Sequence, residues 1–75
     1  MNKSFNHLKV GDKVTRAYYA PSTIFKSQYW YNDGKVVKIE NGIIICEILV
    51  DGYRTMKFYA DTGISTLGEK YGQLV

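Results

Sequence analysis

The chain holds one cysteine, Cys46, and one histidine, His7, the side chains best suited to nucleophilic or metal chemistry. A zinc site needs about four ligands at suitable spacing, and no such set accompanies either residue in the sequence. Cys46 ends the apolar run 43–46, where a thiol acts as a small hydrophobe. A Cys–His nucleophile would instead require an accessible thiol. The sequence therefore predicts neither a metal site nor covalent catalysis.

Asp61-Thr62-Gly63 has the composition of the catalytic triplet of retroviral-type aspartic proteases, in which two aspartates share a proton and activate water. That fold needs a substantial length of chain after the triplet, and only twelve residues follow Gly63. We interpret the triplet as a turn. The segment 68–72 encloses a lysine between two glycines without the spacing of a phosphate-binding loop, and it also predicts a turn. The sequence thus predicts a non-enzymatic protein with no cofactor.

Aromatic residues gather between positions 18 and 31 and favour a binding surface. Tyr and Trp side chains give large, fairly rigid contact areas on which nucleobases stack or a protein partner anchors. The cluster consists of Tyr18, Tyr19, Phe25, Tyr29, Trp30 and Tyr31. The alternative role is to pack a loop over one end of the fold. We expect that role for Phe25 and for one of Trp30 and Tyr31, and leave both roles open for the other tyrosines.

Basic residues alternate with these aromatic residues, and single-stranded nucleic acid needs both, because phosphates take the charge and bases take the stack. The chain has ten Lys and Arg against seven Asp and Glu, and its net charge of +3 favours anionic partners only mildly. The predicted contact residues, for nucleic acid or for a protein partner, are Arg16, Tyr18, Tyr19, Lys26, Tyr29, Trp30 and Arg54.

The elements that position these residues are strands. Three β-rich segments between 33 and 60 are separated by Asn41-Gly42 and Asp51-Gly52. Both dipeptides tolerate the positive φ of a two-residue type I′ turn, so they predict two hairpins. Alternation along the strands then predicts which positions face the core. They are Ile44, Cys46, Ile48 and Val50 in the middle strand and Met56 and Phe58 in the next, with Arg54 at the rim.

The first of these three strands, at 34–40, has an apolar pattern that allows two arrangements. Val37 and Ile39 form its cleaner apolar set and are predicted to face inward. Val36 also packs in the core if a bulge follows Gly34, because a bulge changes the alternation of side chains.

The remainder of the chain predicts a first strand near 12–19 and a short last strand before the C-terminus, after the turns at 61–63 and 68–72. Between the first strand and the meander, residues 20–32 predict a long aromatic-rich loop. No window of 11 or more residues has the 3.6-residue apolar period of a helix.

A chain of 75 residues forms one domain, with residues 1–7 expected to be flexible and 8–75 to form the barrel. A chain this short buries only about 60% of the surface that its unfolded form exposes, so it cannot support two separate sheet faces. Closing the sheet shares one core among all strands and removes exposed edges. The predicted fold is therefore an all-β, five-stranded small barrel.

Val10-Gly11-Asp12-Lys13-Val14, followed by Trp30 and then Gly34-Lys35-Val36-Val37-Lys38-Ile39, resembles Src-homology-3-like small barrels of the KOW and Tudor type. The resemblance covers residues 8–60. In such barrels Gly-Asp precedes the first strand, and the Gly-Lys-Val segment forms the second after a variable loop. It implies a binding module for RNA, DNA-associated machinery or modified protein tails, without selecting among them. In style, the chain is also similar to small accessory proteins of bacteriophages and other mobile elements.

The sequence thus predicts a binding module, with nucleic acid or a nucleoprotein complex as the first partner class. The alternative is a protein-interaction or inhibitor module of a phage or mobile element. A third is a structural protein that self-associates through the outward residues Ile43, Ile45 and Leu49. The lone Cys46, the absence of a signal-peptide pattern and the absence of the ~18 apolar residues of a membrane span favour a cytoplasmic protein. We expect no membrane partner, and a monomer or weak homo-oligomer.

Overall fold

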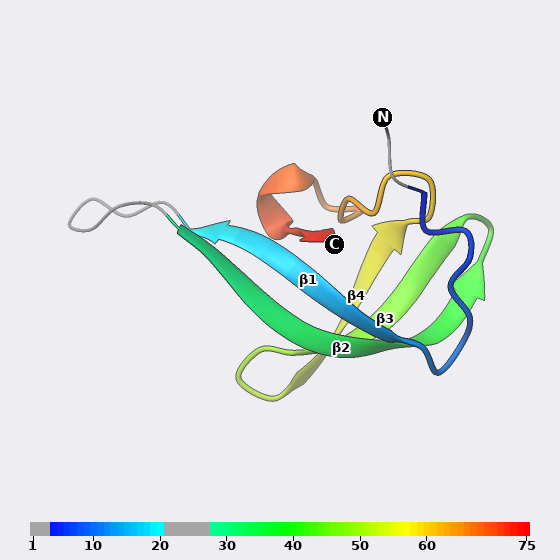
Figure 1. Cartoon of the computed structure of the whole chain (residues 1–75), viewed down its shortest axis with the longest axis horizontal. Coiled ribbons are helices and arrows are strands. Elements are labelled where there is room, and N and C mark those ends of the chain that lie inside the picture. Colours follow the sequence, from blue (N-terminus) through cyan, green and yellow to red (C-terminus); the bar gives the residue numbers. More distant parts are fainter. Residues whose placement is uncertain (1–3, 21–27) are drawn as a thin grey trace.

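The structure, a computed structural model, describes residues 4–20 and 28–75 and is an all-β, curled half-barrel (Figure 1). Its five antiparallel strands have the order β4-β3-β2-β1-β5. The elements are β1 (Lys13–Ala20), β2 (Gln28–Glu40), β3 (Ile43–Leu49), β4 (Tyr53–Tyr59), the 3-10 helix η1 (Glu69–Tyr71) and β5 (Gln73–Leu74). Within the described ranges, no helix is long and apolar enough to cross a membrane. The predicted all-β class, the five strands and the short last strand are confirmed.

The C-terminal segment crosses the open side of the half-barrel. It meets β4 through a bridge between Phe58 and Ser65, and it meets itself through a bridge between Ile64 and Gln73. β5 then pairs with β1 at Arg16 and Ala17. These contacts cover part of the edges of β4 and β1, which would otherwise expose unpaired backbone groups.

The two predicted hairpins are present. Asn41 (φ 51) and Gly42 (φ 76) form the two-residue connection between Glu40 and Ile43, as the Asn-Gly dipeptide predicts. The second hairpin also contains its dipeptide at positive φ, but its connection has three residues, 50–52, since the last pair joins Leu49 to Tyr53. The Val50 N–H donates to the carbonyl of Gly52 at 2.9 Å within that loop.

The core lies on the concave side of the sheet and confirms the predicted faces of β3 and β4. Ile44, Cys46, Ile48 and Phe58 are at most 1% exposed. Val50 and Met56 are partly buried against them. The remaining members of the core cluster are Phe5, Val14, Val36, Ala60 and Leu74.

The inward positions of β2 confirm the predicted alternative, in which Val36 packs in the core beside a bulge, and correct only the inward placement of Val37. Val36, at 1% exposed, is the core residue, whereas Ile39 is 40% exposed and Val37 lies at a bulge where the pairing shifts. Paired residues share a face, so Val36 opposite Cys46 and Ile39 opposite Ile44 both lie on the concave side. Val36 and Ile39 are three residues apart and would face opposite sides of a regular strand. The bulge at Val37 shifts the alternation by one residue, so both side chains face the concave side.

The predicted long loop at 20–32 is wrong for its second half, because residues 28–32 belong to β2. They pair with β1 from Ala20 opposite Gln28 to Arg16 opposite Asn32, whereas β2 pairs with β3 only from Gly34 onward. Residues 21–27 lie outside the described residues. We call residues 17–20 of β1 and 28–31 of β2 the aromatic ribbon, which extends beyond β3 on the left of Figure 1.

The core also extends toward the N-terminus, to Phe5, ahead of the predicted start of the barrel at residue 8. Phe5 is 5% exposed, and its backbone N–H donates to the carbonyl of Ala60 at 2.8 Å. A β-carbon added to Gly63 would overlap the Phe5 ring and would be only 2.9 Å from its Cδ2 atom. Gly63 has φ 79, so a glycine there serves both the turn and the seating of the ring.

Candidate aromatic interface

The aromatic ribbon presents its side chains on two faces. Tyr18 and Trp30 are opposite each other and share the concave side with Arg16. Tyr19 is opposite Tyr29, and Tyr31 is opposite Ala17; all four share the convex side. This division follows from strand alternation, since neighbouring residues point to opposite faces and paired residues point to the same one.

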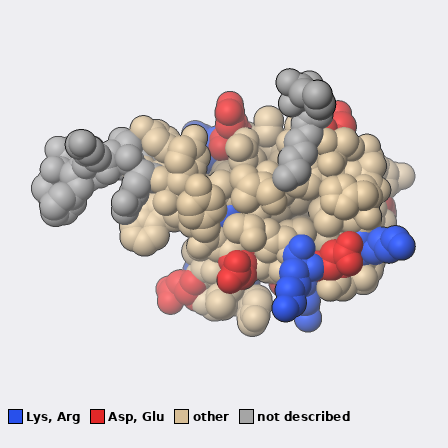
Figure 2. All heavy atoms as spheres, in the orientation of Figure 1, with Lys and Arg blue, Asp and Glu red and all other residues tan. Residues whose placement is uncertain are grey.

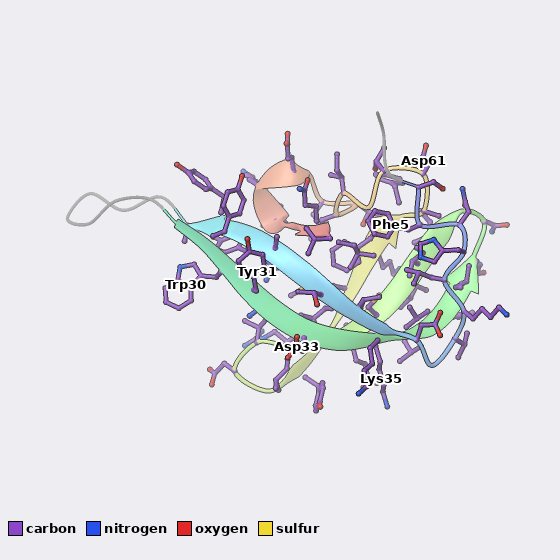
Figure 3. All side chains as sticks on the ribbon, viewed as in Figure 1. Phe5, Trp30, Tyr31, Asp33, Lys35 and Asp61 are labelled. Carbon is purple, nitrogen blue, oxygen red and sulfur yellow. The ribbon has the colours of Figure 1, made fainter. Side chains whose placement is uncertain are left out.

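Four of these five aromatic side chains are about half exposed or more: Tyr19 at 49%, Tyr29 at 57%, Trp30 at 55% and Tyr31 at 65%. The rings of Tyr19 and Tyr29 contact each other, with centroids 5.2 Å apart and planes tilted by 57°. The prediction that one of Trp30 and Tyr31 has a structural packing role is wrong. Both side chains are more than half exposed, because this part of β2 extends beyond the end of β3. Figure 3 shows Trp30 projecting past the edge of β2. Phe25 lies outside the described residues.

Arg16, predicted as a contact residue, is 7% exposed and bonded within the protein. Its Nε and Nη2 donate to the carbonyl of Tyr71 at 3.0 and 2.7 Å, and its Nη1 donates to Oδ1 of Asn32 at 2.9 Å. Burial lowers the pKa of its guanidinium from the ordinary value, an effect that the neighbouring Tyr18 opposes. The guanidinium carbon lies 4.8 Å from the centre of the Tyr18 ring. Arg16 therefore joins β1, β2 and η1.

The other two predicted cations are not brought to the described ribbon. Lys26 lies outside the described residues. Arg54 is exposed on β4, where its Nε donates to the carbonyl of Val50 at 3.0 Å. In the strand order β3 and β2 lie between β4 and β1, so Arg54 and Tyr18 are on strands that do not pair with each other.

Charged side chains on the convex face begin directly beside the ribbon, at Asp33, and both signs are present. Across β1, β2 and β3, one row of this face contains Lys13, Lys35 and Glu47. On the same face of β2, Lys38 forms an exposed salt bridge to Glu40 at 3.1 Å. The ribbon itself, residues 17–20 and 28–31, contains no Asp, Glu, Lys or Arg. Figure 2 shows mixed charge over the body and a tan surface at the ribbon.

The outward residues at the other end of the sheet are also partly apolar. Tyr53 and Tyr59, 68% and 44% exposed, pair across the strands with Leu49 and Ile43. Ile43 and Tyr59 line a shallow hollow of about 380 Å³, together with Ile45. This is the region expected for self-association, and cross-strand packing already covers part of Ile43 and Ile45. A larger hollow, of about 680 Å³, adjoins the N-terminal segment and the start of β1.

The residues considered for catalysis have structural surroundings. Asp61-Thr62-Gly63 forms the predicted turn: Oγ1 of Thr62 accepts from the N–H of Ile64 at 3.2 Å, and the Gly63 N–H donates to the carbonyl of Tyr59 at 2.7 Å. His7 stacks on Phe5, with ring centroids 6.4 Å apart. Across 4–20 and 28–75, no group of three His, Cys, Asp or Glu residues is placed to hold a metal ion.

Cys46 is 0% exposed, and burial raises the pKa of its thiol to about 11. We expect iodoacetamide at pH 8 to alkylate Cys46 at least about tenfold more slowly in the folded protein than in denaturant, because only the thiolate reacts and the folded thiol stays protonated. Intact-mass kinetics measure the two alkylation rates, and equal rates in the folded and denatured protein would contradict this expectation.

The pKa of the Cys46 thiol is higher in the folded protein than its ordinary value of 9.0. The free energy of unfolding should therefore fall progressively as the pH rises from 9.0 to about 11.

Sequence reasoning placed Tyr29, Trp30 and Tyr31 on a loop and so missed the exposed backbone edge of β2. The signal was present in the Tyr-Trp-Tyr run, since aromatic residues favour strands, but its partner strand lies across a long connection.

Comparison with protein-family models, with curated proteins and with solved structures found no match to this chain.

Proposed function

We propose that this chain is a non-enzymatic protein-interaction module that binds through the aromatic ribbon. The observation that carries the proposal is the gathering of Tyr19, Tyr29, Trp30 and Tyr31, each about half exposed or more, on a ribbon without charged residues. Buried Tyr and Trp anchors supply most of the affinity in many protein interfaces, whereas charged residues are depleted at their centres.

Nucleic acid is the less favoured partner because its phosphates need cations beside the stacking rings. The Arg16 guanidinium donates to Tyr71 and Asn32, and Arg54 is on β4, which β3 and β2 separate from β1. On the convex face Lys38 forms a salt bridge to Glu40, and Lys13 and Lys35 share a row with Glu47. These placements support a neutral, apolar contact over an electrostatic one.

The more specific origin of the chain is also a proposal. The Gly11-Asp12 lead-in and the Gly34-Lys35-Val36 strand support a place among Src-homology-3-like barrels of the KOW and Tudor type. The small size and the aromatic content support an accessory role in a phage or mobile element, acting on a host protein in the cytoplasm.

A capture experiment with a nuclease arm tests the proposed function. Immobilised wild-type protein and the Tyr19→Ala/Tyr29→Ala variant are exposed to lysate of the source organism, with half of each sample treated with nuclease. The matched control is Tyr53→Ala/Tyr59→Ala, which removes two exposed tyrosines from the convex side of β4. We expect a nuclease-resistant protein that the ribbon variant captures at least about tenfold less than the wild type, because truncating two anchors costs more than about 1.4 kcal/mol.

The opposite outcomes are equally specific. A captured species that disappears on nuclease treatment and with high salt would indicate nucleic-acid binding. A protein lost with the Tyr53→Ala/Tyr59→Ala variant but retained by the ribbon variant would place the interface on β4. Either result would overturn the proposal.

A further inference from the structure

The outer edge of β2 is open along the aromatic ribbon. β2 pairs with β1 from Gln28 onward, but its pairing with β3 begins only at Gly34. Among the described strands, none lies beside residues 28–32 on that side. Figure 1 shows this stretch of β2 as the free border of the sheet.

Hydrogen-bond parity shows which backbone groups face this edge. The Val36 N–H donates to the carbonyl of Asp12, so the backbone N–H and C=O of Val36 point toward the β1 side of β2. In an antiparallel pair such residues alternate with residues directed away, which places the N–H and C=O of Tyr29 and Tyr31 on the open edge. The hydrogen bonds of β1 have the same alternation. Thr15 is opposite Asp33, but its carbonyl accepts from the N–H of Val75 in the C-terminal segment and not from β2.

This edge lacks the usual protection against strand pairing. Natural edge strands carry lysine, proline, inward charges or bulges that hinder addition of another strand. Residues 28–32, Gln-Tyr-Trp-Tyr-Asn, have no charge and no proline, and the bulge of β2 lies further along, at Val37. The open backbone groups and the exposed rings therefore occupy the same short segment.

The segment is complementary to itself. When two copies of β2 lie antiparallel with Trp30 opposite Trp30, Tyr29 of each copy is opposite Tyr31 of the other. The outward N–H and C=O groups of both tyrosines then face matching groups across a two-fold axis, which is the symmetry of most homodimers. No like charges meet in this register, because residues 28–32 are uncharged.

We propose that the first occupant of this edge is a second copy of the chain, and that two β2 strands join at Trp30 into a continuous four-stranded ribbon. The inference rests on the proposed function, since both use the aromatic ribbon. Paired residues share a face, so the concave side carries the row Tyr18, Trp30, Trp30, Tyr18 across the dimer. On the convex side, the Tyr19 and Tyr29 rings of one copy meet the Tyr31 ring of the other.

The geometry limits the dimer in length and in strength. β3 occupies the β2 edge from Gly34, so the added strand extends no further than residue 33. The exposed parts of four aromatic side chains in each copy amount to an interface on the order of 1,000 Å², near the lower limit for a specific complex. A reversible dimer, detectable at micromolar to high-micromolar concentration, is the expected state.

Charge complementation at the axis tests the register. Sedimentation velocity over a concentration series is run on the wild type, on Trp30→Lys, on Trp30→Asp and on an equimolar mixture of the two variants. We expect the wild type to dimerise, each variant alone to dimerise at least about tenfold more weakly because like charges meet, and the mixture to form a heterodimer. Trp30 is 55% exposed, so both variants should fold, which circular dichroism verifies. The control is Tyr53→Lys, on β4.

Each contrary result overturns the inference. A wild type that stays monomeric at high concentration excludes the dimer. A dimer that Tyr53→Lys weakens as much as Trp30→Lys does, or a mixture that stays monomeric, excludes the Trp30 register. A monomeric wild type that still captures a nuclease-resistant protein through Tyr19 and Tyr29 leaves the proposed function standing, whereas a Trp30-dependent dimer that captures nothing refutes that function alone.

Discussion

Replacing Gly34 with alanine is expected to destabilise the protein by about 3 kcal/mol, because the new methyl group has no space. Gly34 lies where β2 begins to pair with β3, opposite Ile48. Its added β-carbon would meet the carbonyl of Glu47 and would be 3.2 Å from the Cα of Ile48, both of which are backbone. A backbone cannot move aside as a side-chain end can, so the two strands must separate. Urea denaturation followed by tryptophan fluorescence or circular dichroism measures the loss.

The control for this variant is Gly52→Ala. Gly52 has φ 97 and nothing within 4 Å of its would-be β-carbon, so alanine there incurs backbone strain without a clash. The expected cost is about 1 kcal/mol. Gly34→Ala should also be less harmful when combined with Ile48→Val, which removes the methyl group nearest the clash. A Gly34→Ala variant as stable as Gly52→Ala would show that β2 and β3 do not pack this closely.

Replacing Arg16 with alanine is also expected to cost about 3 kcal/mol, because it removes three hydrogen bonds from a buried charged donor. The carbonyl of Tyr71 would lose two of them, and Oδ1 of Asn32 would lose the third. If Arg16 instead served an external phosphate, its removal would leave stability nearly unchanged and weaken binding. Denaturation midpoints therefore separate the two roles.

Two further variants locate the effect of Arg16. Arg16→Lys should recover less than half of the lost stability, because an ammonium lacks the planar fork that reaches both acceptors. Asn32→Ala should cost only about 1 kcal/mol, since one bond is lost while those to Tyr71 remain. Equal stability of wild type and Arg16→Ala would contradict the structural role.

Much of the meander could be predicted because its signals are local. Asn41-Gly42 tolerates a turn at positive φ, and the alternation along β3 separates Cys46 from Glu47 without reference to other strands. A turn and the alternation beside it involve residues close in sequence, and their preferences do not depend on the rest of the fold. The site was predictable only as a set of side chains, since the aromatic composition of residues 18–31 is visible but their arrangement is not.

What only the tertiary structure decided depends on contacts between residues far apart in the chain. Residues 28–32 became a strand because β1 pairs with them, and Val36 entered the core because a bulge at Val37 reset the alternation against β3. Arg16 is buried because its guanidinium donates to the carbonyl of Tyr71, which is 55 residues away in the chain. The sequence by itself determined the positions of the turns, the faces of β3 and β4 and the aromatic content. The tertiary structure decided which cations are buried and which edge stays open, because burial and pairing are set by neighbours that no local pattern specifies.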